Sequence, residues 1–491
     1  MRKSCFIVLL LLLTGWADAA EIAGARPNII FILTDDLGYG DAGCTGNPIV
    51  KTPNIDRIYA EGVRFSDFRV SPTCSPTRCA IMTGRHEFHS GVTHTINERE
   101  RMSLSATTIA QVLQSAGYKT GIFGKWHLGD EPAYQPGRRG FDEVFIHGGG
   151  GIGQGYPGTC GDAPGNAYFN PVILHNGTFE KTRGFCTDVF FKQALQWIEQ
   201  VKGKQPFFCY LATNAAHAPL SCPPQYEVPY KGRVVPLVST FYGMIANIDE
   251  NVGTLLDQLK QWGIDDNTLI IFMNDNGGFD LACKIWNAGM KGSKNTAHNG
   301  GTRAMSLWRW PAALKPATCD ALTAHIDLFP TFAELAGAKI PPDLAAKLEG
   351  FSVAPLLKDP AAPWHDERIL LTHVGRWANG APPDKYGQCS LRYQRYLLYR
   401  LSDQSSWELY DLKADPGEEH NLVSSNRELL TKLNAAYDVW WTKTLPLLEN
   451  EQAYKTAPRM NPFKAMYWRQ YKGPGPNNVP PPAGFDFKVP S

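Results

Sequence analysis

Asn28-Ile29-Ile30-Phe31-Ile32-Leu33-Thr34-Asp35-Asp36 is the stretch that sets the architecture expected of this 491-residue chain. Residues 28–33 form an apolar run of strand length without polar alternation, which predicts a central strand buried on both faces of a parallel sheet. Ligands of open α/β sheets bind outside the carboxyl ends of the strands, so Asp35 and Asp36 are placed to hold a metal ion. A solvated turn with an aspartate helix cap explains this segment equally well when it is taken alone.

Three further apolar runs of strand length end in residues suited to metal binding or to acid–base chemistry. The runs and the residues that follow them are 119–123 with Lys125 and His127, 206–212 with His217, and 268–273 with Asp275 and Asn276. Helical apolar spacing between the last two runs, at 240–261, predicts an α/β arrangement. If the four strands are parallel, all of these polar side chains lie at one edge of one sheet.

A second informative stretch is Cys74-Ser75-Pro76-Thr77-Arg78, which leads to Thr83-Gly84-Arg85. Pro76 suits the first turn of a helix because it lacks the N–H that would be unpaired there. Cys74 is therefore expected at a helix N-terminus, where partial positive charge favours anions and a reactive cysteine. A small buried thiol beside a structural arginine is the alternative interpretation of this stretch alone.

The pattern Cys-x-Pro-x-Arg, extended by Thr-Gly-Arg, resembles the signature of the type I, formylglycine-dependent sulfatases. Four other segments resemble motifs of that family and follow the same order, between about residue 26 and residue 440. They are the strand with the aspartate pair, Gly124-Lys125-Trp126-His127, Asp275-Asn276-Gly277-Gly278 and Leu409-Tyr410-Asp411-Leu412. The resemblance implies an alkaline-phosphatase-like α/β fold with a large, mixed, mainly parallel sheet sandwiched by helices and a smaller C-terminal α/β domain.

The same resemblance implies a metal centre and a modified nucleophile. It places a calcium ion on Asp35, Asp36, Asp275 and Asn276, in agreement with the preference of calcium for oxygen ligands. Cys74 would be converted to formylglycine by a maturation enzyme. The hydrate of formylglycine would then be the nucleophile and would also touch the metal.

The resemblance also implies roles for five charged or titratable residues. Arg78 and Lys125 would hold the formylglycine hydrate and its charge, and His127 would be the base that collapses the intermediate. His217 and Lys294 would bind the sulfate and help to protonate the leaving oxygen.

The sequence departs from the family around Lys294. Many members have Gly-Lys-Gly-Thr-Thr, whereas this chain has Ser293-Lys294-Asn295-Thr296. Lys291 is therefore a rival for the active-site lysine. Lys294 is favoured because its distance along the chain to Gly300-Gly301 matches the family pattern.

The implied activity is hydrolysis of sulfate monoesters, with a sulfated sugar or polysaccharide as substrate and aryl sulfates as possible surrogates. The insert at 148–186 and the C-terminal tail are expected to shape the pocket. A phosphate or phosphonate monoester hydrolase of the same superfamily is one alternative function. A non-catalytic carbohydrate-binding homologue, in which Cys74 stays a thiol, is another.

The N-terminus has the features of a signal peptide at 1–19, namely Met1-Arg2-Lys3, an apolar run at 5–13 and Ala17-Asp18-Ala19 as a cleavage site. The apolar run is too short to span a bilayer, and we expect no membrane span, so the mature protein should be exported to a periplasm or the extracellular space. A net charge of +1 gives no electrostatic footprint for nucleic acid.

The expected domains are a catalytic domain at 20–362, a small α/β domain at 363–448 and a Pro/Gly-rich, irregular tail at 449–491. Export permits disulfides, but the chain has only eleven cysteines. Cys160 and Cys186 flank the insert and are a candidate pair, whereas Cys209 is expected to be a buried free thiol.

Overall fold

The computed structural model describes residues 22–156, 158–458 and 460–472, so the expected signal peptide lies outside the described residues. A ten-stranded sheet in the order β12-β2-β11-β9-β1-β8-β4-β5-β6-β7 forms the centre of the molecule. Its strands are β1 (Asn28–Thr34), β2 (Val63–Phe65), β4 (Lys119–Lys125), β5 (Glu143–His147), β6 (Val172–His175), β7 (Thr178–Lys181), β8 (Phe207–Ala212), β9 (Thr268–Asn274), β11 (Ser306–Arg309) and β12 (Ala317–Cys319).

The four predicted core strands are adjacent and parallel. β1 pairs with β8 on one side and with β9 on the other, and β8 pairs with β4. β6, β7 and β11 run antiparallel to their neighbours, so the sheet is mixed. The prediction of a large, mainly parallel sheet is confirmed.

The position of β1 between two hydrophobic cores explains why its sequence does not alternate between apolar and polar residues. Ile29, Phe31 and Leu33 belong to the hydrophobic core on one face of the sheet, whereas Ile30 and Ile32 belong to the core on the other face. Both faces are buried because helices cover them, and a strand between two cores needs apolar residues throughout.

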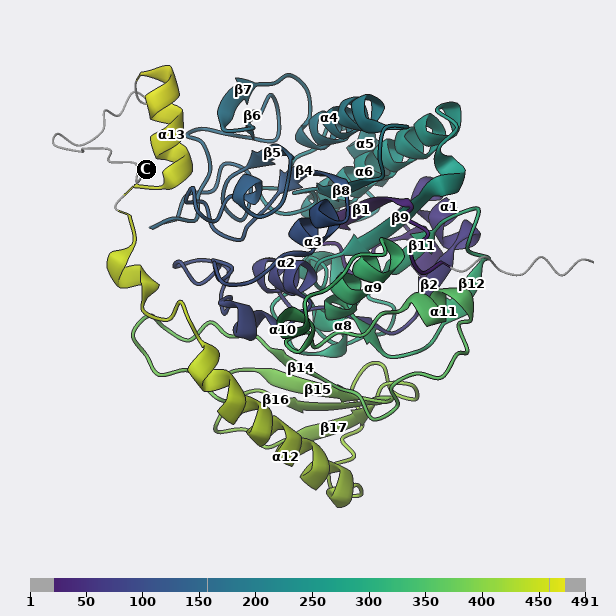
Figure 1. Ribbon diagram of the computed structural model, residues 1–491. Coiled ribbons are helices and arrows are strands. Elements are labelled where there is room, and N and C mark those ends of the chain that lie inside the picture. The colour runs from purple at the N-terminus through teal and green to yellow at the C-terminus, as the bar shows by residue number, and fades with distance from the viewer. Residues whose placement is uncertain (1–21, 157, 459, 473–491) are drawn as a thin grey trace, which may run out of the picture.

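Helices lie on both sides of the sheet (Figure 1). The core that contains Ile30 also contains side chains of α1 (Pro53–Glu61), α4 (Cys186–Val201) and α6 (Pro236–Gln261). The opposite core contains side chains of α2 (Cys74–Thr83), α3 (Ile109–Ser115), α9 (Leu328–Leu335) and α11 (Ala354–Lys358). The shorter helices are α5 (Pro224–Glu227), α7 (Asp280–Cys283), α8 (Asn299–Thr302) and α10 (Pro342–Ala345).

A four-stranded antiparallel sheet forms the C-terminal part of the fold (Figure 1). It consists of β14 (Ile369–His373), β15 (Cys389–Tyr393), β16 (Tyr396–Arg400) and β17 (Glu408–Asp411), and α12 (Arg427–Thr444) covers it. A smaller sheet joins β3 (Phe68–Arg69), β10 (Arg303–Ala304) and β13 (Thr323–Ala324). The exact domain limits at 362 and 448 stay predictions.

The chain after α12 runs back along the large sheet to α13 (Pro462–Tyr471), which lies beside β7 (Figure 1). The ring of Phe179 on β7 contacts those of Phe463 and Tyr467, with centroids 5.9 and 5.6 Å apart. Gln470 accepts from the main-chain N–H of Phe179 and donates to its carbonyl, both at 2.7 Å. The prediction of an irregular tail is therefore wrong for 462–471, where apolar side chains pack a helix onto the sheet.

None of the helices in the described part of the chain is long and apolar enough to cross a membrane.

Candidate active site

The structure brings all the predicted site residues to one edge of the large sheet. The aspartate pair follows β1, Lys125 ends β4, and Asp275 and Asn276 follow β9. A cavity of about 160 Å³ is lined by Cys74, His127, His217 and Lys294, among others. The rival Lys291 lies elsewhere, with its Nζ 5.7 Å from the ring centre of Tyr410.

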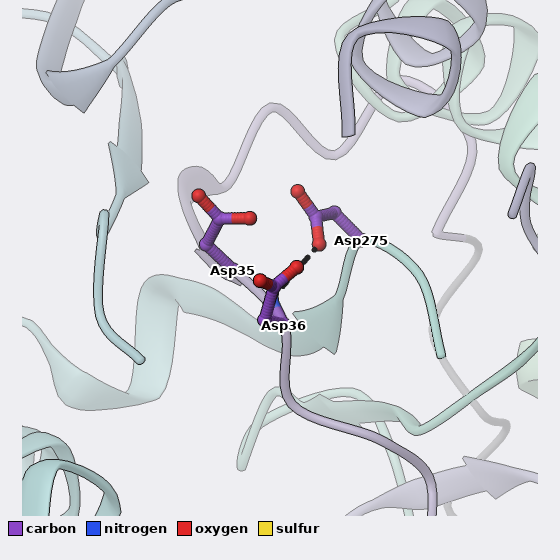
Figure 2. Close-up of side chains that lie close together, drawn as sticks. All are labelled: Asp35, Asp36 and Asp275. Atoms are coloured by element: carbon purple, nitrogen blue, oxygen red, sulfur yellow. Dashed lines mark hydrogen bonds between the residues drawn. The ribbon is translucent and has the colours of Figure 1, made fainter. Parts of the chain in front are cut away.

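Three carboxylates converge beside this cavity. Figure 2 shows Asp35, Asp36 and Asp275 turned toward a shared space, and each offers an oxygen within 4.8 Å of the others. The main-chain N–H of Asp36 donates to Asp275 Oδ1 at 3.4 Å. Asp35 Oδ1 and Asn276 Oδ1 are buried without a hydrogen-bond partner among the described residues. Buried, unpaired oxygens beside three carboxylates fit a hard, oxygen-binding cation.

Burial and neighbouring charges shift the pKa values of Asp35 and Asp275 in opposite directions. Burial raises the pKa of Asp35, but Lys125, whose Nζ lies 2.5 Å from Asp35 Oδ2, and other nearby cations bring it well below its usual range. Burial and the negative charge of Asp35 raise the pKa of Asp275 to about 7, against the opposing effect of Arg78. Ionisation of all three carboxyl groups at the same time is therefore unfavourable without a bound cation.

Arg78 and Lys294 bind this cluster directly. Arg78 is fully buried and donates from Nη2 and Nε to Asp275 Oδ2, at 2.8 and 3.2 Å. Lys294 Nζ lies 2.6 and 2.8 Å from the two oxygens of Asp36. Burial lowers the pKa of Lys294, but the attraction of Asp36 outweighs it and holds the pKa above its ordinary range. Lys294 thus keeps its positive charge at the cavity, while Arg78 lies behind it, buried against the carboxylate cluster.

Cys74 begins helix α2, as predicted, and is only 3% exposed. Its Sγ lies 3.4 Å from His127 Nδ1. Ser75 Oγ donates to the main-chain carbonyl of His127 at 2.8 Å, which ties the start of α2 to the segment after β4. The helix N-terminus and the histidine are thereby fixed relative to each other.

His127 is oriented by the loop carbonyl of Thr95. His127 Nε2 and the Thr95 oxygen are 2.7 Å apart, so Nε2 carries the hydrogen and Nδ1 presents a lone pair to Cys74. Burial, followed by the charge of Lys125, lowers the pKa of His127 well below its usual range. The imidazole is therefore neutral and can accept a proton at Nδ1.

His217 follows β8 and also lines the cavity. Its Nδ1 bonds to the carbonyl of Ala218 at 2.6 Å, and its Nε2 lies 3.9 Å from Asp36 Oδ2. Burial lowers the pKa of His217, while the nearby Asp36 opposes this shift. An anion bound beside Nε2 would favour the protonated imidazole.

The backbone at the strand ends explains the local sequence. Asp36 and His127 have left-handed φ values of 60° and 59°, which turn the chain sharply after β1 and β4. Gly124 lies against β8, where a Cβ would be 1.9 Å from the carbonyl oxygen of Ala212. A glycine is therefore required at the start of the Gly-Lys-Trp-His segment.

Several residues that line the cavity were not predicted from the sequence. The insert supplies Gly150, Gln154 and Tyr156, in agreement with its expected role, but these residues were not identified individually. Thr95, Ile96, Asn295 and Arg376 complete the lining. Arg376 lies three residues after β14, which belongs to the small C-terminal sheet, so the pattern of polar residues after the central strands did not identify it.

The predicted disulfide between Cys160 and Cys186 is wrong, because both residues are free and buried. The Sγ of Cys160 lies 3.7 Å from His127 Nε2, whereas Cys186 starts α4 and belongs to a hydrophobic core. Packing at two different places keeps the thiols apart. Cys209 is a buried free thiol, as predicted.

Comparisons with known proteins agree with this geometry. A family model of sulfatases matches residues 27–338, and a model of the C-terminal part of N-sulphoglucosamine sulphohydrolase matches residues 293–437. Arylsulfatase G of Rattus norvegicus is 31% identical over 441 residues, which cover 81% of this chain and 80% of the relative. Arylsulfatase A of Homo sapiens is 30% identical over 461 residues, which cover 83% and 85%.

Comparison with solved structures also identifies sulfatases and related hydrolases as similar to this chain. Ps i-CgsB, crystallised in complex with k-i-k-neocarrahexaose, matches with a TM-score of 0.76 and 29% identity over 92% of this chain and 98% of that chain. The phosphonate monoester hydrolase of Agrobacterium radiobacter shares the fold, with a TM-score of 0.60 and 18% identity over 87% and 97%. The alkaline-phosphatase-like fold is thus confirmed. Since the first family model covers well over half of the sequence, the chain belongs to the sulfatase family and is a sulfuric ester hydrolase.

Proposed function

We propose that this enzyme hydrolyses sulfate monoesters of saccharides and releases inorganic sulfate, with a formylglycine made from Cys74 and a calcium ion. The observation that carries the proposal is the cavity itself, where Cys74 lies against His127 and shares the lining with His217 and Lys294. A saccharide is favoured because Ps i-CgsB, similar over 92% of this chain, was crystallised with an oligosaccharide. Aryl sulfates would serve as surrogate substrates.

Asp35, Asp36, Asp275 and Asn276 would hold the calcium ion, with residue 74 beside it. The donor set is composed of hard oxygens, and two of those oxygens are buried without a partner in the described structure. When bound, the ion would neutralise charge on the sulfate oxygens as a Lewis acid. Arg78 binds Oδ2 of Asp275, and Lys125 binds Oδ2 of Asp35. These two ion pairs hold the carboxylates in position.

Cys74 would be oxidised by a formylglycine-generating maturation enzyme before the protein folds around it, since the thiol is buried in the folded chain. Hydrated formylglycine would supply two hydroxyl groups on one carbon, so that sulfate can be expelled as the aldehyde reforms and water need not attack sulfur. Arg78 and Lys125 would stabilise charge at this position, where the N-terminus of α2 also favours an anion.

His127 would act as the base. Its neutral imidazole presents Nδ1 to residue 74 while Nε2 stays bonded to the Thr95 carbonyl, so a proton from residue 74 can be accepted without reorientation of the ring. Gly150 closes over this ring, because a Cβ there would lie 2.7 Å from His127 Cε1.

His217 and Lys294 would bind the sulfate and assist the leaving group. Lys294 keeps its charge through Asp36 and can donate to a sulfate oxygen. His217 Nε2 lines the cavity, and a bound sulfate would raise its proton affinity. The protonated ring can then donate its Nε2 proton to the ester oxygen as the sulfur–oxygen bond breaks.

Export by the signal peptide at 1–19 remains part of the proposal, with the mature enzyme in a periplasm or outside the cell. Measuring where the full-length protein accumulates, and the mass of its N-terminal peptide, tests this directly. An intact N-terminus on protein retained in the cytoplasm would contradict it.

The decisive experiment uses protein made in a host that has the maturation machinery. Hydrolysis of 4-nitrophenyl sulfate, 4-nitrophenyl phosphate and a panel of sulfated saccharides is compared, and peptide mass spectrometry reports the state of residue 74. We expect formylglycine and a preference for sulfate esters. A preference for the phosphate ester would support the phosphomonoester alternative, and an unmodified thiol without turnover would support a carbohydrate-binding homologue.

A further inference from the structure

Arg376 reaches the active-site cavity from the C-terminal sheet, three residues after β14. Gly375 and Arg376 both have left-handed φ values, of 70° and 68°. The glycine is required because a Cβ there would lie 2.1 Å from the Thr93 carbonyl oxygen. An arginine in this conformation is strained and persists only where its surroundings hold it. Close packing of Gly375 on the loop at Thr93 thus holds Arg376 at the cavity.

The guanidinium of Arg376 has no acidic partner among the residues that the structure describes. Its one described side-chain hydrogen bond runs from Nη2 to Thr95 Oγ1 at 3.3 Å, and its Nε is buried without a partner. Other arginines of low exposure have several partners: Arg139 is bound to main-chain carbonyls, and carboxylates bind Arg78, Arg99, Arg309, Arg368 and Arg392. The positive charge of Arg376 is therefore available to a ligand.

Asn295 presents a complementary acceptor to the same cavity. Its φ is 68°, its main-chain N–H donates to the Pro72 carbonyl at 2.9 Å, and its Oδ1 is buried without a described partner. Glycine adopts this backbone conformation freely, so the asparagine adds a polar side chain where the fold alone would not need one. It directly follows Lys294, which places it beside the sulfate-binding group.

We propose that Arg376 and Asn295 form a subsite that binds a second anionic substituent, a sulfate or a carboxylate, on the saccharide whose sulfate is cleaved. The guanidinium would bind that substituent through paired hydrogen bonds, and Asn295 Oδ1 would accept from a neighbouring hydroxyl. This subsite rests on the proposed saccharide sulfatase function. The subsite is separate from the position of the cleaved sulfate. The cations that are bound to the carboxylate cluster would neutralise the charge of that sulfate.

The test compares matched substrates that differ by one anionic group. The pairs are neocarrabiose with one and with two sulfates, and glucosamine 6-O-sulfate with glucosamine 2-N,6-O-disulfate; 4-nitrophenyl sulfate is the reference. Arg376→Asn removes the charge but tolerates the left-handed backbone, Arg376→Lys keeps the charge, and Asn295→Gly removes only the side chain. Arg183→Ala, at an exposed arginine of the insert, is the control for general electrostatic attraction.

We expect the wild type to prefer the more anionic member of at least one pair by about 10- to 100-fold in kcat/KM, as a charge-assisted pair provides. Arg376→Asn should abolish that preference, Arg376→Lys should retain part of it, and Arg183→Ala should leave it unchanged. The loss on 4-nitrophenyl sulfate should be at least tenfold smaller than on the preferred saccharide. Calorimetric binding of the same pairs to Cys74→Ala should reproduce the pattern without turnover.

Three outcomes would overturn the subsite: no preference within either pair, a preference that survives Arg376→Asn, or an equal loss on the aryl sulfate and the saccharide. The last result would assign Arg376 to the cleaved sulfate itself. Failure of the proposed function looks different, because no sulfate ester would then be hydrolysed by the wild type, while the binding measurements would still report on the subsite.

Discussion

Replacing Gly150 with alanine should slow turnover by displacing His127. The added Cβ would lie 2.7 Å from Cε1 and 2.8 Å from Nε2 of the imidazole, whereas ordinary contacts begin at 3.4 Å, so the ring would have to retreat by about 0.7 Å. It is held on both sides, by the Thr95 carbonyl at 2.7 Å from Nε2 and by Cys74 Sγ at 3.4 Å from Nδ1. The alanine at position 150 would therefore displace the His127 ring itself, because no flexible side chain lies between them.

A misplacement of about 1 Å costs on the order of 100-fold in rate, so a shift of this size should lower kcat roughly 10- to 100-fold. Overpacking of a buried site should also destabilise the fold by about 1–3 kcal/mol. The effect on kcat should exceed the effect on KM, because His127 is proposed to act on residue 74 and not to bind the substrate.

The assay is hydrolysis of 4-nitrophenyl sulfate at saturating substrate, with the thermal midpoint and the formylglycine content measured on the same samples. Gly155→Ala is the matched control, because it lies in the same insert and nothing lies within 4 Å of its added Cβ. A wild-type kcat in Gly150→Ala, or an equal loss in both variants at equal formylglycine content, would refute the reasoning.

Cys74→Ala should abolish turnover with little change in the thermal midpoint; residual turnover above a mock preparation would contradict the role of residue 74. Calcium removal should lower activity and the thermal midpoint together, because the carboxylates then repel each other, and calcium should restore both. His217→Ala should lose about 10²- to 10⁴-fold on a sulfated sugar and less on an aryl sulfate that leaves easily, so equal losses would exclude a general acid. Burial lowers the pKa of His325 and of His373 to about 4, so the unfolded chain binds more protons below pH 6.5. Each should remove up to about 1.4 kcal/mol of stability per pH unit between pH 6.5 and 4, and a flat unfolding profile there would contradict this.

The four core strands of the central sheet could be predicted from the sequence, because each is a continuous apolar run followed by polar residues. Parallel strands bring their carboxyl ends together, so Asp35, Lys125, His217 and Asp275 could be assigned to one edge before any coordinates were known. Lys294 was distinguished from Lys291 only by spacing, and the structure places Lys294 on Asp36.

Other features depend on contacts between distant segments, which spacing along the chain does not encode. Arg376 reaches the cavity only because the small sheet packs beside the loop that carries Thr95. Cys160 and Cys186 are near each other in the sequence but pack at different places. Helix α13 forms where an irregular tail was predicted, because its apolar side chains pack against the ring of Phe179 on β7.

The contact between Gln470 and Phe179 has a consequence for how molecules of this enzyme meet one another. β7 is the last strand on its side of the large sheet, and the outward N–H and C=O of Phe179 would otherwise be open to a strand from another copy. The side-chain amide of Gln470 occupies both groups, as the main chain of an adjoining strand would. Helix α13 thereby covers this edge of the sheet at Phe179, where a strand of another chain could otherwise add by main-chain hydrogen bonds.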